Sequence, residues 1–377
     1  MPKKKKGMII FITIVAVLFV VIWKYRNQFA PSNVLYFIKD SMCTIGRGEG
    51  FPKSIEGTLI NRNNFQAMGK NLVYVNDTSV ITLNRSAKEI SNRQHSFATP
   101  ILRLGGPNIL TYNLNGKNLR IERKSEIVHN KSVDDGIISA AVSDNGTYVI
   151  ITEPKGYSAA MTVYGAKSDD IRYKYCFSGC KVHDVAIDDD GKRIVVLGHD
   201  IVNESMAAQV YVFDCFHDEP IGKFDYKDTT MLSVEFLSHN KFAAVGDNVT
   251  SVVDIKNMKK NDYSYKNKVL NTFSCDKEQG IALVLAASAK SEKGEIVVLN
   301  LNGKQVHDID VDMNISDISY KDTTIACISG NELICYKNFN NEKICKEIDT
   351  DAKRILLTNK STAYILGVSA IKKIVLF

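Results

Sequence analysis

Three aspartates spaced two residues apart form the most regular group of candidate metal ligands in the chain. Asp308, Asp310 and Asp312 alternate with Ile309 and Val311. Successive side chains of a β-strand point to opposite faces, so the three carboxylates would share one face. Calcium takes roughly six to eight oxygen ligands, which makes this face a candidate calcium site. The simpler interpretation, which we favour, is the solvated face of an outer strand.

Two further segments resemble ligand-binding loops. Asp188 to Gly191 resembles the start of a calcium loop but lacks the closing glutamate, so it predicts a hairpin turn with a positive-φ glycine. The glycine-rich segment from Gly46 to Gly50 lacks the Lys-Ser/Thr of a phosphate-binding loop. Neither segment indicates a cofactor, and we expect none.

The cysteines and histidines offer little reactive chemistry. Cys176 and Cys180 are close in sequence and form a candidate disulfide, provided that they lie in an oxidising compartment. Cys-x-x-Cys pairs are absent, which argues against a zinc ribbon. Four His-Asp dipeptides occur, but adjacent residues on a strand face opposite sides, so a structural or solvent-facing role is favoured.

The N-terminal residues predict the cellular location of the protein. Lys3 to Lys6 precede an uncharged apolar run, Met8 to Trp23, and Trp23 and Tyr25 would suit a membrane interface. A cleaved signal peptide is the alternative, but the run is long and lacks a small-x-small cleavage site. We therefore expect a single-pass protein of the plasma membrane. Its parts are a cytoplasmic basic tail (1–7), a transmembrane signal-anchor helix (8–25), a linker (26–33) and an extracytoplasmic domain (34–377).

The charge balance argues against nucleic acid as a partner. The formal net charge is +6, with 48 Lys and Arg against 42 Asp and Glu. Residues 1–26 carry six of the basic residues and no acidic one, so the remainder of the chain is neutral. A neutral domain lacks the excess positive charge that drives non-specific phosphate binding.

A repeat of about 40 residues fills the remainder of the chain and matches the length of a propeller blade. Each copy has an alternating apolar strand, a polar turn and a second apolar strand, which predicts antiparallel hairpins. The copies begin at Asn64, Ile101, Ala140, Val185, Val234, Thr272, Ile318 and Ile355. We predict an all-β fold, a β-propeller of eight blades. Seven blades are the alternative because the first two copies are weak, and an irregular β-sandwich pair is a further one.

The last repeat has only three strands, whereas the N-terminal part has strands to spare. Val34 to Ile38 and Ser54 to Ile60 are the two candidates. One of them would complete the final blade and close the ring, which removes exposed sheet edges.

The repeats resemble those of WD40-type and quinoprotein-like propellers, although the glycine-histidine and tryptophan-aspartate signatures are missing. Val212 to Asp214 and Val252 to Asp254 stand where the tryptophan-aspartate strand end would be. The whole chain resembles a family of bacterial, mainly Gram-positive, single-pass membrane proteins with a WD40-like propeller and no assigned function. The segments that carry this resemblance are Gly48 to Gly57, Ser91 to Arg103, Asp134 to Glu153 and Ile187 to Gly198. The resemblance implies the fold and the membrane location, and it transfers no catalytic residue.

These observations favour a non-catalytic interaction scaffold of the cell envelope. Residues 8–25 would contact membrane lipid, and the propeller would bind an envelope protein or a cell-wall polymer through its loops. Ser288 to Glu295 and Val202 to Ala208 are the longest insertions and the expected contact loops. The alternative is an envelope enzyme that uses the central channel, either a quinoprotein-like dehydrogenase or a polysaccharide-cleaving enzyme.

Overall fold

The computed structural model describes residues 31–55, 60–202, 205–288, 291–339 and 343–377. The chain divides into two compact units, of which the second covers Gly46–Phe377. The predicted anchor at 8–25 lies outside the described residues, as does the basic tail at 1–7. Within the described ranges, no helix is both long enough and apolar enough to span a bilayer.

Helix α2 (Pro31–Thr44) is the described element of the first unit. The prediction of a strand at Val34–Ile38 is therefore wrong. The apolar residues Val34, Leu35, Ile38 and Met42 recur at the three- to four-residue spacing of one helix face, which outweighs the short apolar run. Pro31 suits the first turn of a helix, where its missing N–H costs no hydrogen bond.

In the second unit, the described residues form 32 strands in eight four-stranded antiparallel sheets, which we number as blades in ring order. Blade 1 has β2 (Phe65–Met68), β3 (Asn71–Val75), β4 (Ser79–Leu83) and β5 (Glu89–Gln94), preceded by the short helix η1 (Arg62–Asn64). Blade 2 has β6 (Pro100–Gly105), β7 (Asn108–Asn113), β8 (Asn118–Glu122) and β9 (Ile127–Ser132). Blade 3 has β10 (Ile137–Val142), β11 (Tyr148–Thr152), β12 (Ala159–Tyr164) and β13 (Ile171–Phe177). Blade 4 has β14 (Lys181–Ile187), β15 (Arg193–Val202), β16 (Ser205–Asp214) and β17 (Gly222–Lys227).

The remaining blades repeat the same order. Blade 5 has β18 (Met231–Ser238), β19 (Lys241–Gly246), β20 (Val249–Asp254) and β21 (Lys259–Ser264). Blade 6 has β22 (Val269–Asp276), β23 (Gly280–Ala286), β24 (Lys293–Leu299) and β25 (Gln305–Asp312). Blade 7 has β26 (Asp317–Lys321), β27 (Thr324–Ser329), β28 (Glu332–Lys337) and β29 (Lys343–Glu347). Blade 8 has β30 (Arg354–Asn359), β31 (Thr362–Leu366), β32 (Ala370–Val375) and β1 (Lys53–Ser54).

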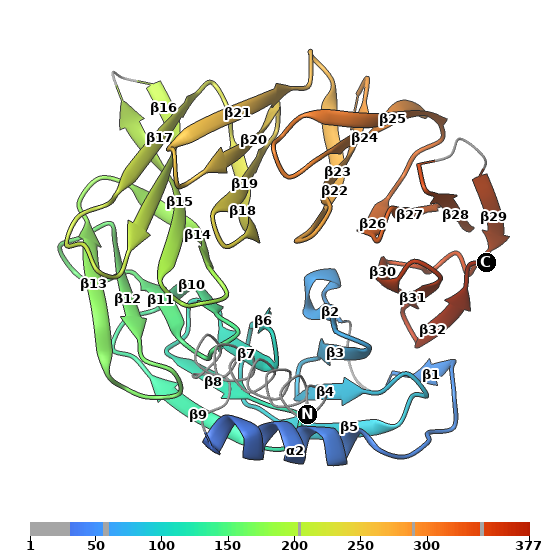
Figure 1. Cartoon of the computed structure of the whole chain (residues 1–377), viewed down its shortest axis with the longest axis horizontal. Helices are drawn as coiled ribbons and strands as arrows, with labels where there is room; N and C mark the ends of the chain where they lie inside the picture. Colours follow the sequence, from blue (N-terminus) through green and yellow to red (C-terminus); the bar gives the residue numbers. More distant parts are fainter. Residues whose placement is uncertain (1–30, 56–59, 203–204, 289–290, 340–342) are drawn as a thin grey trace, which may run out of the picture. The chain divides into compact units, whose positions relative to one another are not determined.

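The eight blades close into a ring. The first strand of each blade contacts the first strand of the next, and β30 of the last blade contacts β2 of the first. Figure 1 shows these first strands facing the centre of the second unit. The two-residue strand β1 pairs with β32, with Lys53 opposite Ile371 and Ser54 opposite Ala370. The predicted eight-bladed propeller is confirmed, and an N-terminal strand completes the last blade as expected.

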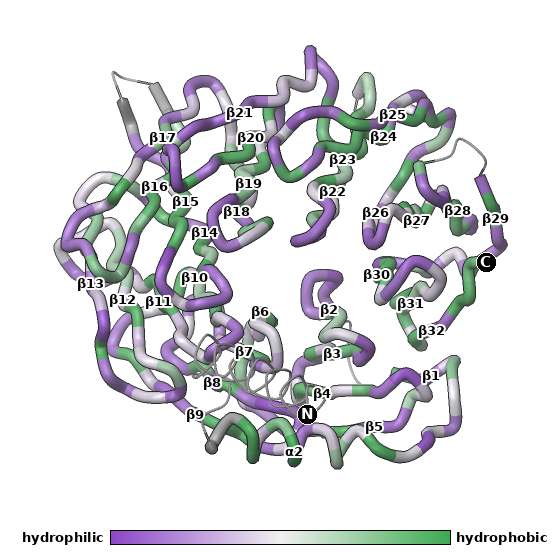
Figure 2. The backbone as a smooth tube through the Cα atoms, in the orientation of Figure 1, coloured by the Kyte–Doolittle hydropathy of each residue, from purple (hydrophilic) through white to green (hydrophobic). Residues whose placement is uncertain are grey.

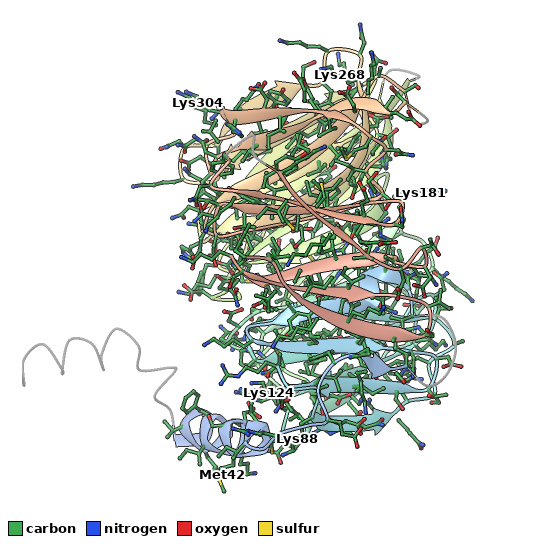
Figure 3. All side chains as sticks on the ribbon, turned by 90° about the vertical axis from the view of Figure 1, so that its right-hand side faces the viewer. Met42, Lys88, Lys124, Lys181, Lys268 and Lys304 are labelled. Atoms are coloured by element: carbon green, nitrogen blue, oxygen red, sulfur yellow. The ribbon has the colours of Figure 1, made fainter. Side chains whose placement is uncertain are left out.

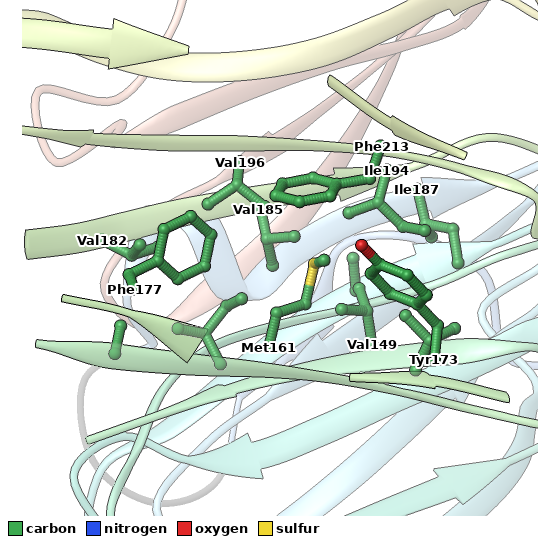
Figure 4. Packing of buried hydrophobic residues seen from close by; sticks show 14 of the residues in the cluster. Val149, Met161, Tyr173, Phe177, Val182, Val185, Ile187, Ile194, Val196 and Phe213 are labelled. Carbon is green, nitrogen blue, oxygen red and sulfur yellow. The ribbon is translucent and has the colours of Figure 1, made fainter. Parts of the chain in front are cut away.

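The core lies between neighbouring blades. Middle strands such as β3 and β23 are buried at every position, whereas outermost strands such as β17 alternate between exposed and covered residues. Figure 2 shows the corresponding change from hydrophobic middle strands to hydrophilic outer ones, and Figure 3 shows polar side chains such as Lys181, Lys268 and Lys304 projecting into solvent. Blades 3 and 4 illustrate the packing in Figure 4, where Met161 and Phe177 meet Val182 and Phe213.

Strand direction gives the ring two distinct faces. One face carries the connection between the first and second strands of each blade. The other carries the connections between second and third strands together with those that lead from one blade to the next, and we call it the crossover face. Loops on such a face vary in length without disturbing the sheets, and they are where propellers present binding residues.

Candidate functional site

The innermost strands bring ionisable side chains from four different blades close to one another. They are Arg103 on β6, Asp184 on β14, Glu235 on β18 and Cys275 on β22. Arg103 Nη2 lies 3.2 Å from Asp184 Oδ1. Blades 2 and 4 are not neighbours, so this ion pair spans β10 of blade 3.

Asp184 is tied to the neighbouring blade as well as to Arg103. Its Oδ2 accepts hydrogen bonds from Ser233 Oγ and from the Val234 N–H of β18, each at 3.1 Å. Both carboxylate oxygens are thus engaged, and together they join the innermost strands of blades 2, 4 and 5. A carboxylate used in this way is a structural link between blades.

Asp317 makes the equivalent link between blades 7 and 8. Its fully buried carboxylate accepts a hydrogen bond from the Ile355 N–H at 2.7 Å and from Arg354 Nη1 at 3.4 Å, and it also pairs with Arg62. Burial raises the pKa of Asp317, while the two arginines and the backbone N–H oppose that shift. Three charged or polar donors on one buried carboxylate form a satisfied hydrogen-bond network, which indicates a structural role and not substrate binding.

Hydroxyl groups repeat the same arrangement at uncharged positions. Ser319 Oγ accepts a hydrogen bond from the Leu357 N–H at 2.9 Å, which again joins blades 7 and 8. Ser274 Oγ accepts one from the Tyr320 N–H at 3.1 Å, which joins blades 6 and 7. Several polar side chains of the innermost strands therefore link neighbouring blades.

Glu235 and Cys275 differ from these links. Desolvation by the surrounding protein raises the pKa of the Glu235 carboxyl, the negative charge of Asp184 adds to the shift, and Arg103 opposes it. Burial also raises the pKa of the Cys275 thiol, which is hydrogen-bonded to Glu235. Cys275 is thus a neutral thiol at physiological pH rather than a nucleophilic thiolate. Glu235 still contacts solvent, so it is the channel group best suited to donate a proton.

A separate groove lies where blades 1 and 2 meet on the crossover face. It has a volume of about 670 Å³ and is lined by the end of β5, the connection that follows it, the start of β8 and the end of β9. Its lining includes Phe97, Asn118, Asn130 and Lys131. The Lys131 ammonium group is paired with Asp169 at 2.6 Å and lies over the ring of Tyr164 in blade 3. These are hydrogen-bonding and aromatic groups of the kind that bind a polar chain.

Ion pairs and hydrogen bonds hold the base of the groove rigid. Arg120 donates to the Gln94 carbonyl at 2.6 Å and pairs with Glu122 at 2.5 Å. His95 Nε2 lies 3.1 Å from the Asn76 carbonyl, and its Nδ1 accepts the Phe97 N–H at 3.2 Å. Burial lowers the pKa of His95, so the ring is neutral and serves as a support.

The three aspartates of the predicted calcium site lie on β25, the outermost strand of blade 6. Asp308, Asp310 and Asp312 share one exposed face, as expected from their spacing. Asp308 Oδ1 accepts a hydrogen bond from Gln305 Nε2 at 3.0 Å. The part of the chain that the structure describes contains no group of three or more His, Cys, Asp or Glu side chains arranged to hold a metal ion. Calcium binding at this face stays a prediction.

Cys176 and Cys180 are free thiols in the structure. Cys176 lies on β13, and Cys180 lies in the connection to β14, where it is buried in the cluster between blades 3 and 4. Burial raises the pKa of the Cys180 thiol to about 12, which makes it unreactive at neutral pH. The disulfide is thus not formed in this structure.

The predicted turn at Asp188 to Gly191 is confirmed, whereas one of the two predicted contact loops is not. The turn at Asp188 to Gly191 joins β14 to β15, with Gly191 at φ +68° and Asp188 Oδ1 accepting the Lys192 N–H at 2.7 Å. Ser288 to Glu295 begins in the connection between β23 and β24 of blade 6, and its last three residues belong to β24. The long loop expected at Val202 to Ala208 is wrong, because Val202 ends β15 and Ser205 to Ala208 belong to β16, which continue the hairpin of blade 4. Their role in partner binding is untested, and the groove at blades 1 and 2 carried no sequence signal of its own.

The sequence matches one family model, described as a family of unknown function (DUF5711), over residues 52–376. That range covers nearly the whole propeller, including the strand that closes it. A search of curated proteins finds no match to the chain.

Solved structures with a similar fold include three propellers. Sqt1 of Saccharomyces cerevisiae has a TM-score of 0.59 and 8% identity, covering 85% of this chain and 98% of its own. BamB of Moraxella catarrhalis has a TM-score of 0.53 and 9% identity, covering 87% and 100%. The C-terminal WD40 domain of Sif2 has a TM-score of 0.59 and 15% identity, covering 86% and 98%. At such identities the similarity establishes a WD40-like propeller fold and nothing finer.

Proposed function

The chain belongs to the DUF5711 family of unknown function, and from that premise we propose that it is a membrane-anchored scaffold whose propeller binds an envelope protein without catalysing a reaction. Its buried channel carboxylates are occupied in joining blades. The groove between blades 1 and 2 is instead lined by unreactive side chains, among them the two asparagines Asn118 and Asn130 and the aromatic residue Phe97. Such a surface on a rigid fold suits recognition of a polar segment of another protein.

The location outside the cytoplasm is part of the same proposal. The basic residues Lys3 to Lys6 ahead of the apolar run favour a cytoplasmic N-terminus, and residues 8–25 would be held in membrane lipid. The neutral charge of the chain beyond residue 26 fits a partner other than nucleic acid.

The groove is the observation that carries the proposal, and it provides a matched test. Asn130 is the fourth residue of β9 and lines the groove, whereas Asn92 is the fourth residue of β5 and does not. Both side chains are exposed on outermost strands of adjacent blades. An arginine fills the groove at the first position and projects into solvent at the second.

The experiment is crosslinking in the native membrane followed by affinity capture of the full chain. We expect the unmodified protein and Asn92→Arg to recover the same stoichiometric envelope protein, and Asn130→Arg to lose it. Equal recovery by both variants would place the contact elsewhere on the propeller. Recovery of no protein, together with turnover of a wall polymer, would overturn the scaffold.

The second candidate function is an enzyme of the cell envelope that uses the channel. Glu235, with its raised pKa and its access to solvent, lies near the ionic pair of Asp184 and Arg103. Two carboxyl groups in unlike environments are the minimum for cleaving a polysaccharide. A quinoprotein-like dehydrogenase is less well supported, because the sequence has one tryptophan, Trp23, outside the propeller. Loss of polymer turnover in Glu235→Gln would favour the enzyme.

A further inference from the structure

Helix α2 presents an unusually apolar surface. Val34, Leu35, Ile38, Phe37 and Met42 are exposed, with Phe37 70% and Met42 65% accessible, and Ile45 follows directly after the helix. At about 100° per residue, these side chains fall within an arc of roughly 160° of the helix. Figure 3 labels Met42, whose side chain projects from α2. Contiguous exposed apolar surface of this kind marks a binding surface.

The opposite side of α2 has a different character. Tyr36 lies there and is half-buried, and Asp40 is 6% exposed. The helix is therefore two-sided, with its apolar side chains left open to solvent.

We propose that the apolar side of α2 lies in the interface of the lipid bilayer as a second membrane contact. The proposal rests on the membrane anchor of the proposed function. Only residues 26–30 separate Tyr25 from Pro31. A chain of that length reaches at most about 20 Å, so α2 begins close to the membrane surface if residues 8–25 span it. The apolar side of α2 can then reach the lipid of the same membrane in every copy of the protein.

The charges of α2 indicate which lipid interaction dominates. The helix carries one cation and one anion, Lys39 and Asp40, so its net charge is zero. Binding must come from burial of apolar side chains and not from attraction to anionic headgroups. The contact therefore forms on neutral lipid and persists at high salt.

The single tryptophan of the chain provides a clean test with the full-length protein. Wild-type protein reports on the anchor through Trp23. In a Trp23→Phe background, Ile38→Trp places the fluorophore near the centre of the apolar side, and Tyr36→Trp places it on the opposite side. Each protein is reconstituted into vesicles of dibrominated phosphatidylcholine, and the quenching of tryptophan fluorescence is measured.

We expect strong quenching of Trp23, strong quenching at position 38 that is insensitive to salt, and several-fold weaker quenching at position 36. Quenching of Trp23 without quenching at position 38 would overturn the lipid contact while leaving the anchor intact. Quenching at position 38 without quenching of Trp23 would overturn the anchor of the proposed function while leaving the lipid contact of α2 intact. A blue-shifted but unquenched tryptophan at position 38 would mean that a second copy covers the helix. Far-ultraviolet circular dichroism shows whether each variant keeps the β-rich fold.

Discussion

At the scale of single residues, Asp184 and Asp317 on the innermost strands act as links between blades. Asp184 and Asp317 each accept a backbone N–H from the innermost strand of the next blade, together with an arginine side chain. The partner lies 50 residues away for Asp184 and 38 for Asp317. Such pairs hold neighbouring sheets in register, which apolar packing alone does not specify. A carboxylate left without these donors would be costly to bury.

The first prediction concerns Asp184. Asp184→Ala should lower the free energy of unfolding by about 1–3 kcal/mol, because it removes the acceptor of the Val234 N–H and leaves Arg103 without its ion pair. Asp184→Asn keeps an acceptor and should cost less. Asp308→Ala, on the exposed face of β25, is the control and should change stability by under about 0.5 kcal/mol. Urea unfolding of the solubilised protein measures all three, and equal effects at positions 184 and 308 would contradict the linking role.

A second prediction follows from the raised pKa of Glu235. The carboxyl ionises at about 4.5 in the unfolded chain and at a higher pH in the folded protein. As the pH rises between these values, the unfolded chain loses its proton first, so the folded state loses stability. Glu235→Gln removes this loss and should be more stable than the wild type at neutral pH. Melting temperatures across the acidic to neutral range test this, and parallel pH profiles of the two proteins would contradict it.

At the scale of elements, a two-residue strand completes the eighth blade. Strand β1 pairs with β32, and the Ile55 N–H donates to the Ser369 carbonyl at 2.8 Å. The missing fourth strand of the last repeat could be predicted, because three apolar segments near the C-terminus leave one sheet edge unpaired. Which N-terminal segment supplies that strand could not be predicted. Val34 to Ile38 looked equally suitable, yet helix spacing over the longer segment prevails there.

The third prediction tests this closure. Ile55→Pro removes the N–H that bonds to Ser369 and should lower the free energy of unfolding by about 1–3 kcal/mol. Ile55→Val keeps the N–H and a similar shape, so its cost should stay below about 1 kcal/mol. Ile55→Pro also leaves the edge of β32 unpaired. It should therefore increase self-association, as measured by light scattering. Equal stability of the two variants would show that the ring does not depend on this pairing.

At the scale of the whole molecule, the sequence predicts the ring but not its sites. Eight hairpins at near-even spacing predict eight blades because each blade is local in sequence. The channel group and the groove combine residues from different blades, such as Arg103 with Asp184 and Gln94 with Arg120, and no spacing along one strand reveals them. The three aspartates Asp308, Asp310 and Asp312 could be recognised in the sequence because they lie on a single strand. Their regular spacing reflects the exposed face of that strand.

The fourth prediction concerns the orientation of the chain in the membrane. Among the described free thiols, Cys345 on β29 is exposed, Cys180, Cys327 and Cys335 are buried, and the other four are partly buried. A membrane-impermeant maleimide added to intact cells should therefore label Cys345, and Cys345→Ser should lose most of the label. Labelling that appears only after the cells are broken open would place the propeller in the cytoplasm.

The central claim is that the groove between blades 1 and 2 is a docking site for another protein. A photoreactive amino acid at position 130 of the full-length membrane protein tests it most directly, with position 92 as the matched control on the adjacent blade. We predict one discrete crosslinked protein from position 130 and none from position 92. An identical pattern from the two positions, or no adduct from position 130, would contradict the claim.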